Sequence, residues 1–163
     1  ALDNLSSIIW IFPLTITLHN IEEALWLPSW SQKVKRYHKP VGKNEFYFAL
    51  ICVTLLAYLF SFLYMLYVNN GIIRYVYFGF VGAMILNAIF PHLIATIVLR
   101  QYAPGVITGI LLNVPCYSLL ISFAVKSNVI SLTEVLVSTV IVGGIMLAIL
   151  PILFRIGRKV VDY

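Results

Sequence analysis

Charged side chains are scarce in this sequence. Asp, Glu, Lys and Arg make up 10% of its 163 residues, whereas ordinary soluble domains contain about 25%. The mean hydropathy is +0.97. These values exclude an ordinary soluble domain and predict a multi-pass protein of the cell membrane, with residues 1–163 forming a single transmembrane domain.

Cysteine is scarce as well. The two cysteines, Cys52 and Cys116, lie within apolar segments, and no Cys-x-x-Cys spacing is present. The sequence therefore gives little support to a disulfide framework or to a zinc site built from cysteines. We expect both thiols to pack against apolar neighbours.

Long apolar runs are abundant. Helices that cross a hydrocarbon core of about 30 Å need about 20 residues, and the runs are continuous, without the alternation that barrel strands show. The sequence thus predicts an all-α fold, a polytopic transmembrane helix bundle. Its five helices are expected at residues 5–27, 46–68, 72–99, 106–125 and 132–154, with a long first loop at 28–45.

The basic residues give the bundle an orientation. Nine of the 11 Lys and Arg residues fall in the first and third loops and the C-terminal tail, and only Arg74 and Lys126 fall on the opposite side. The positive-inside rule then places the N-terminus outside and the C-terminus in the cytoplasm. Because these cations flank apolar segments, we expect membrane lipids as partners and no nucleic acid.

One polar stretch, His19-Asn20-Ile21-Glu22-Glu23, lies inside the first apolar segment. Ionisable groups within a bilayer are costly and are usually functional. On a helix, Glu22 and Glu23 follow His19 by three and four residues, so either carboxylate can share a face with the imidazole. Such a face can bind a metal ion.

His92, in the third segment, has a matching depth. At 1.5 Å per residue, His19 lies about 12 Å inside the cytoplasmic end of its helix, and His92 lies about 10 Å inside its own. Two helices therefore bring metal-binding groups to the same leaflet.

Further polar residues accompany these histidines. Pro91 has no backbone N–H, so the Asn87 carbonyl loses its helical partner and a kink is expected. The fourth segment repeats this pairing with Asn113 and Pro115. Before it, Tyr102-x-Pro104-Gly105-x-x-Thr108 forms a turn into a helix whose N-terminal amides favour an anionic group.

Three of these features resemble the signatures of the HXXEE domain family of membrane proteins. They are the stretch 19–23, the Asn87-Ala88 pair followed by His92, and the Tyr102 to Thr108 motif. Together they extend from the first helix into the fourth, so the resemblance covers most of the chain. Each motif is short, and the three in order are more specific. The family is largely uncharacterised, so the resemblance implies no reaction.

We interpret His19, His92 and one glutamate as ligands of a divalent metal. Two imidazoles and a carboxylate are a ligand set of catalytic zinc sites, which keep one position for water. The four-residue spacing favours Glu23 as the ligand and leaves Glu22 as the general base, while the reverse assignment stays open. Zinc is the first expectation, and iron accepts the same ligands.

The expected function is that of a membrane-embedded, metal-dependent enzyme of hydrolase type. A cytoplasmic-leaflet site flanked by basic loops suits a lipid or another amphiphilic substrate. The substrate or the ligands would be oriented by a second set of polar residues: Asn87, Tyr102, Thr108 and Asn113.

Alternatives stay open at this point. The same His and Glu residues could form the relay of a proton- or ion-coupled transporter. The lack of an inverted repeat makes this harder for a monomer, and a homo-oligomer remains open. The polar residues could instead only specify helix packing in a noncatalytic subunit. Glu22 and Glu23 could also pair with lysines of the first loop.

Overall fold

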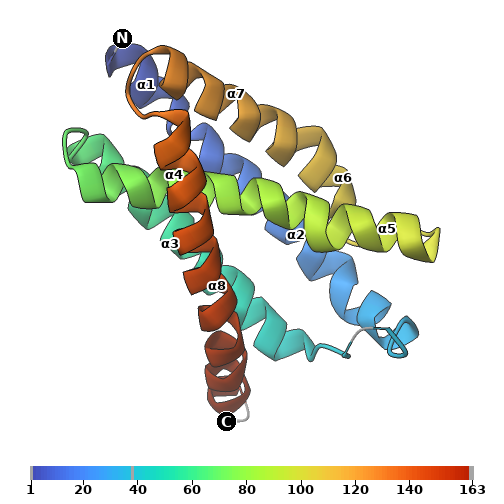
Figure 1. Ribbon diagram of the computed structural model, residues 1–163. Coiled ribbons are helices and arrows are strands. Elements are labelled where there is room, and N and C mark those ends of the chain that lie inside the picture. Colours follow the sequence, from blue (N-terminus) through green and yellow to red (C-terminus); the bar gives the residue numbers. More distant parts are fainter. Residues whose placement is uncertain (1, 38, 162–163) are drawn as a thin grey trace.

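The computed structural model describes residues 2–37 and 39–161, and within these ranges the chain is helical without a strand. Five helical segments form a bundle (Figure 1), which confirms the all-α fold. Three of them contain breaks or π-helical turns. In chain order the elements are α1 (Leu2–Ile8) and α2 (Ile11–Lys33); α3 (Lys43–Leu66); α4 (Gly71–Asn87), the π-helix η1 (Ala88–Leu93) and α5 (Ile94–Leu99); α6 (Val106–Thr108), the π-helix η2 (Gly109–Asn113) and α7 (Val114–Lys126); and α8 (Leu132–Val161).

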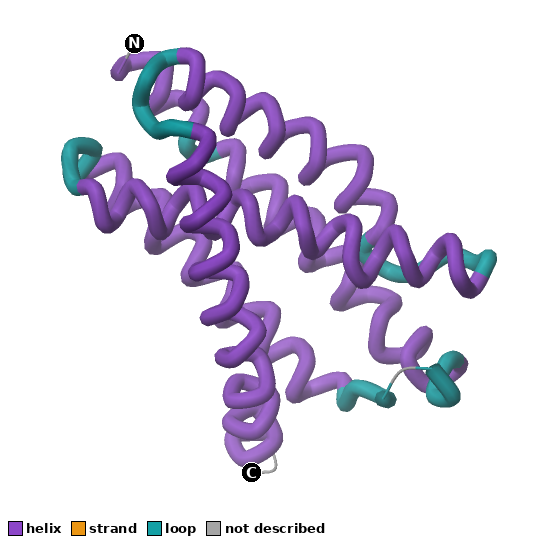
Figure 2. Tube along the Cα trace, viewed as in Figure 1, coloured by secondary structure: helices purple, strands orange, loops and turns teal. Residues whose placement is uncertain are grey.

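Most of the helical segments have the length and apolar composition of membrane-spanning helices. Among the described residues, four stretches are long and apolar enough to cross a bilayer: Lys43–Leu66, Gly71–Leu99, Val106–Lys126 and Leu132–Val160. Helix α2 is also long enough, but it carries the polar run at 19–23, and its crossing stays a prediction. The main loops lie at the ends of the helices (Figure 2). The two termini lie at opposite ends of the bundle (Figure 1).

The first segment differs from the predicted helix 5–27 at both ends. It breaks after Ile8, because Pro13 has no N–H to donate to the Ile9 carbonyl four residues back. The Tyr77 hydroxyl donates to that carbonyl instead, at 2.8 Å. At its other end, α2 continues through Pro28 as far as Lys33, so the predicted loop at 28–45 is too long.

Helix α2 can continue past Pro28 because a proline inside a helix removes only one backbone hydrogen bond and the extension has contacts of its own. The buried Ser31 hydroxyl donates to the Pro28 carbonyl at 2.8 Å and accepts from the Val41 amide at 3.0 Å. Helix α3 then begins at Lys43, where the Glu45 carboxylate accepts a hydrogen bond from the Gly42 amide at 3.0 Å.

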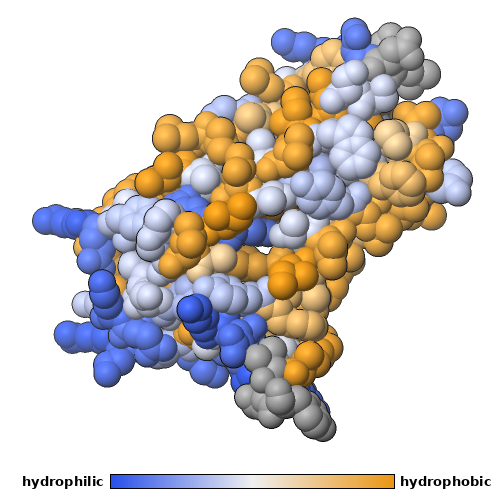
Figure 3. Space-filling model, turned by 180° about the vertical axis from the view of Figure 1, so that it is seen from behind, coloured by the Kyte–Doolittle hydropathy of each residue, from blue (hydrophilic) through white to orange (hydrophobic). Residues whose placement is uncertain are grey.

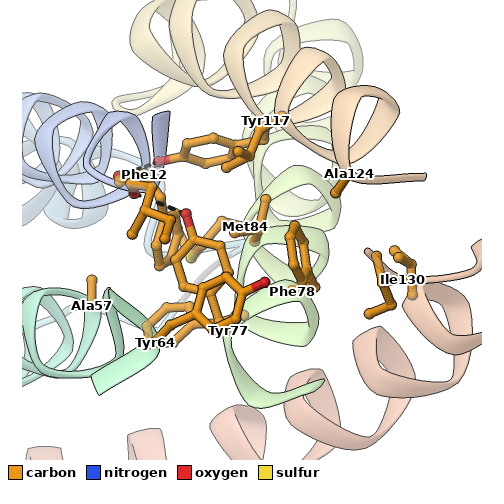
Figure 4. Close-up of a cluster of buried hydrophobic side chains, with 14 of the residues drawn as sticks. Phe12, Ala57, Tyr64, Tyr77, Phe78, Met84, Tyr117, Ala124 and Ile130 are labelled. Atoms are coloured by element: carbon orange, nitrogen blue, oxygen red, sulfur yellow. Dashed lines mark hydrogen bonds between the residues drawn. The ribbon is translucent and has the colours of Figure 1, made fainter. Parts of the chain in front are cut away.

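An aromatic cluster fixes α2 against α4 and α7. The Phe12 ring meets Tyr77, Phe80 and Tyr117 edge to face, with ring centroids 5.0 to 5.6 Å apart, a favourable geometry for aromatic pairs. Figure 4 shows Phe12 between Tyr117 and Tyr77, each from a different helix. The Tyr117 hydroxyl also donates to the Phe12 carbonyl at 3.1 Å. His19 lies two turns further along the same face of α2, so this cluster sets its position.

The surface is divided into a hydrophobic middle and a hydrophilic end. Figure 3 shows hydrophobic residues across the middle of the molecule and hydrophilic residues gathered toward the end where α2 ends and α3 begins. Long apolar side chains such as Leu111, Val140 and Leu147 are exposed, as expected of helices that face lipid rather than water.

Candidate metal centre

Three side chains from two segments converge inside the bundle. Glu23 Oε1 lies 3.0 Å from His19 Nε2 and 2.8 Å from His92 Nε2. The side chains of His19, Glu23 and His92 are 0%, 10% and 6% exposed. The ligand atoms lie within 4.8 Å of one another, so the three side chains could hold one metal ion.

The backbone explains this convergence. His19 and Glu23 are one turn apart on the buried face of α2, together with Phe12 and Ile16. His92 belongs to η1, a π-helix in which Phe90 departs from helical dihedral angles. The kink expected from Pro91 is therefore present, and it turns His92 toward α2. Single π-helical turns of this kind occur frequently at functional sites.

Thr108 determines which nitrogen of His19 carries a proton. The Thr108 hydroxyl donates its single proton to Glu22 Oε1 at 2.6 Å, so its oxygen must accept from His19 Nδ1, 3.0 Å away. In a neutral His19 the proton is then on Nδ1, and the lone pair of Nε2 points at Glu23. A metal-binding histidine is commonly held in this way.

This arrangement requires a proton or a metal ion between His19 Nε2 and Glu23 Oε1. With Nδ1 protonated, a neutral His19 would face its Nε2 lone pair toward a carboxylate oxygen at 3.0 Å, and two acceptors at that distance repel each other. A proton on Nε2 or a metal ion between the atoms removes the repulsion. The donor set, two imidazoles and one carboxylate, fits zinc or iron.

Glu22 has a different environment from Glu23, because the start of the fourth segment surrounds its carboxylate. Oε1 accepts from the amide and the hydroxyl of Thr108, at 2.8 and 2.6 Å. Oε2 accepts from the Tyr102 hydroxyl and from the amides of Gly105 and Ile107, the last two at 2.9 and 3.4 Å. The anionic group that the turn at 102–108 was expected to favour is therefore Glu22 of the same chain.

Tyr102 lies outside the membrane-spanning helices, in the loop before α6. Partial burial and the hydrogen bond to the Glu22 carboxylate raise the pKa of its hydroxyl. Tyr102 therefore stays a hydrogen-bond donor to Glu22 throughout the neutral range.

Gly105 is a site residue that sequence reasoning used only as a turn former. Its φ is +99°, a conformation that favours glycine. A Cβ at this position would lie 2.6 Å from His92 Cε1 and 3.0 Å from His19 Cε1. The signal was present in the Pro104-Gly105 turn, but the approach of this turn to both imidazoles depends on the tertiary fold.

The two predicted asparagines differ in their distance from the centre. Asn87 is close to the centre, with Nδ2 3.4 Å from His19 Nε2 and 3.3 Å from His92 Nε2. Asn113 is fully buried in η2, one turn beyond Gly109, and neither amide atom has a hydrogen-bond partner among the described residues. Asn113 thus lies outside the cluster. The other predicted residues are connected by the contacts above into one cluster: His19, Glu22, Glu23, Asn87, His92, Tyr102 and Thr108.

Comparison with known proteins agrees with these motifs. Residues 10–120 match a family model described as "Protein of unknown function with HXXEE motif". The chain is 53% identical over 151 residues to the uncharacterized protein YrkK of Bacillus subtilis (strain 168), a match that covers 91% of this chain and 94% of that protein. No solved structure matches the chain. With its centre assembled from the motif residues themselves, the chain belongs to the HXXEE family.

Proposed function

We propose that this protein is a membrane-embedded, metal-dependent enzyme of hydrolase type that acts on a lipid or another amphiphilic substrate at the cytoplasmic leaflet of the cell membrane. The observation that carries the proposal is the buried convergence of His19 Nε2, His92 Nε2 and Glu23 Oε1. A divalent metal held by these atoms would supply Lewis acidity. Zinc is the preferred ion and iron the alternative.

In this proposal the two glutamates have separate tasks. Glu23 would hold the metal through Oε1, and its Oε2 would be the group that takes a proton from water. Glu22 is a positioning residue rather than the general base considered from the sequence, because protonating it would weaken hydrogen bonds that both its oxygens accept. Thr108 transmits the effect of Glu22 to the centre, because its hydroxyl oxygen lies beside His19 Nδ1.

Asn87 borders the proposed metal position, since its amide nitrogen lies within 3.4 Å of each Nε2 atom. With both Nε2 lone pairs on a metal, its amide would be free to orient a substrate. Gly105 lets the backbone lie close to both imidazole rings, where a larger residue would not fit. The exposed apolar side chains of the bundle would face lipid, which favours an apolar substrate.

The proposal is tested first by metal analysis. We expect protein purified in a neutral detergent, without chelator, to contain one zinc or iron ion per chain by elemental mass spectrometry. The variants His19→Ala, His92→Ala and Glu23→Gln should lose this metal, because each removes one of three ligands. The matched control Glu134→Gln changes a carboxylate in the first turn of α8 and should retain it.

The reaction is tested with metal-loaded protein in lipid nanodiscs, by following released fatty acids with mass spectrometry. Wild-type protein should release them, and Glu23→Gln should not. A folded, monodisperse wild-type protein that contains no metal, and that takes up none from a zinc or iron buffer, would overturn the proposal.

One observation favours a second candidate. Glu23 Oε1 lies within hydrogen-bonding distance of both imidazoles, and such a chain could pass a proton between His19 and His92. The second candidate is therefore a proton-coupled transporter. Metal-free protein in liposomes that carries a proton flux, abolished by Glu23→Gln and retained by Glu134→Gln, would favour it over the enzyme.

A further inference from the structure

An apolar groove leads from the candidate centre toward one end of the bundle. It has a volume of about 300 Å³ and runs between the C-terminal turns of α2 and helix α5. Its inner end contains His92, beside Pro91 and Pro104, and its wall includes Trp30 and Ala95. The outer rim is open to the bilayer, because Phe90 and Val98 are largely exposed.

The groove continues into a polar mouth. A second cavity of about 420 Å³ is lined in part by Lys33, Arg36 and Gln101. Val34, Tyr37, Val98 and Leu99 line both cavities, so the two cavities lie next to each other. None of the described residues that line either cavity is acidic. The mouth is therefore a cationic site at the end of an apolar channel.

The distance from the mouth to the centre follows from the separation of Lys33 and Glu23 along α2. Lys33 follows Glu23 by ten residues, so the mouth lies about 15 Å from the centre along the helix axis. A molecule whose charged group sits in the mouth would bring its apolar part, rather than its charged group, to His92.

We propose that this groove, which we call the α2–α5 groove, binds a single-chain lipid with an anionic head group. The head group lies between Lys33 and Arg36, and the chain extends toward His92. Charge complementarity selects the anionic head, and a volume at the low end of the about 300–1,000 Å³ of ligand pockets selects one chain over two. The inference goes beyond the proposed function, because a lipid held in this way brings an apolar chain without a hydrolysable bond to His92. It assigns a bound lipid to the groove and does not make that lipid the substrate of the centre.

Trp30 provides a direct probe because it lines the groove. In a Trp10→Phe, Trp26→Phe protein, Trp30 is the remaining tryptophan. The protein is placed in nanodiscs of zwitterionic lipid and titrated with a dibrominated stearic acid, whose bromines quench tryptophan fluorescence on contact. We expect saturable quenching. The methyl ester of the same acid, which has no charge, should quench only weakly and in proportion to its concentration.

Matched variants separate the groove from the lipid around it. Ala95→Phe fills the α2–α5 groove and should abolish the saturable phase. Ala24→Phe places the same ring in a different groove, between α2 and α3, and should leave that phase unchanged. Lys33→Ala combined with Arg36→Ala should raise the half-saturating concentration on the order of tenfold.

The outcomes distinguish this inference from the proposed function. Quenching that is linear in wild-type protein, or that Ala95→Phe leaves unchanged, overturns the groove while bound metal would still support the enzyme. Saturable quenching in a protein that binds no metal supports the groove and overturns the enzyme. Metal content should be normal in Ala95→Phe and in the Lys33, Arg36 double variant, because none of these side chains belongs to the centre.

Discussion

Glu23 holds Oε1 between two imidazoles, whereas the neighbouring Glu22 holds both oxygens against the start of α6. Thr108 joins the two settings, because its hydroxyl donates to Glu22 and its oxygen faces His19 Nδ1. The charge of Glu22 therefore acts on the candidate centre through Thr108, by fixing the proton on the outer nitrogen of His19 and leaving the inner nitrogen available.

This chain of contacts predicts the effect of replacing Thr108. Thr108→Val keeps the shape of the side chain and removes the hydroxyl, so His19 loses the partner that sets its tautomer. We expect zinc affinity to fall by about 10–100-fold, measured by competition with a chromophoric chelator. Thr108→Ser should bind zinc nearly as well as the wild type.

Thr17→Val is the matched control, because the Thr17 hydroxyl bonds to the Pro13 carbonyl and to Tyr58, away from the centre. Equal zinc affinities in Thr108→Val and Thr17→Val would contradict a positioning role for Thr108.

At this scale the sequence predicts the residues of the centre better than their roles. The spacing within 19–23 puts both glutamates within reach of His19, so periodicity alone could not separate them. They are separated by contacts with Tyr102, Gly105 and Thr108, about eighty residues further along the chain. Such long-range pairings are not encoded in the local pattern of α2.

At the scale of elements, Glu22 attaches the start of α6 to the middle of α2. Its carboxylate accepts hydrogen bonds from three backbone amides at the beginning of the fourth segment. These amides would otherwise lack partners, as at any helix start. Because the attachment spans two segments, it should contribute to the stability of the bundle as well as to the centre.

The variant Glu22→Gln tests this attachment. The amide keeps the shape of the side chain, but its NH₂ group faces hydrogen-bond donors, so we expect the free energy of unfolding to fall by about 2–3 kcal/mol. Glu45→Gln is the control, since Glu45 pairs with Arg158, which is 53% exposed, and should cost at most about 1 kcal/mol. Denaturant titration in detergent, followed by circular dichroism, measures both. Equal losses would contradict a stabilising attachment of α6 to α2 through Glu22.

Helix bounds show where prediction from the sequence stops. The starts of the last two segments, at Val106 and Leu132, are as predicted, since turn residues precede both. Pro13 and Pro28 mislead in opposite directions. Pro13 ends a helix because Tyr77 from another segment takes the freed carbonyl, while Pro28 is accommodated inside α2, where Ser31 bonds to its carbonyl. For Pro13, the contact that takes the freed carbonyl comes from a residue remote in sequence, which the local pattern cannot show.

At the scale of the whole molecule, the candidate centre and the basic mouth of the α2–α5 groove lie toward the same end of the bundle. That end also carries the loop between α2 and α3, the turn before α6 and the C-terminal end of α8 (Figure 1). If the positive-inside rule holds for this chain, this end faces the cytoplasm and the groove takes lipid from the inner leaflet.

The orientation is tested by labelling single cysteines in intact cells. In a Cys52→Ala, Cys116→Ala background, Lys39→Cys marks the exposed loop after α2 and Asn69→Cys marks the exposed loop after α3. A membrane-impermeant maleimide should label Asn69→Cys in intact cells and Lys39→Cys only after permeabilisation. The reverse pattern would move the centre and its substrate to the outer leaflet. Labelling of both positions from outside would mean that α3 does not cross the membrane, and would contradict its assignment as a membrane span.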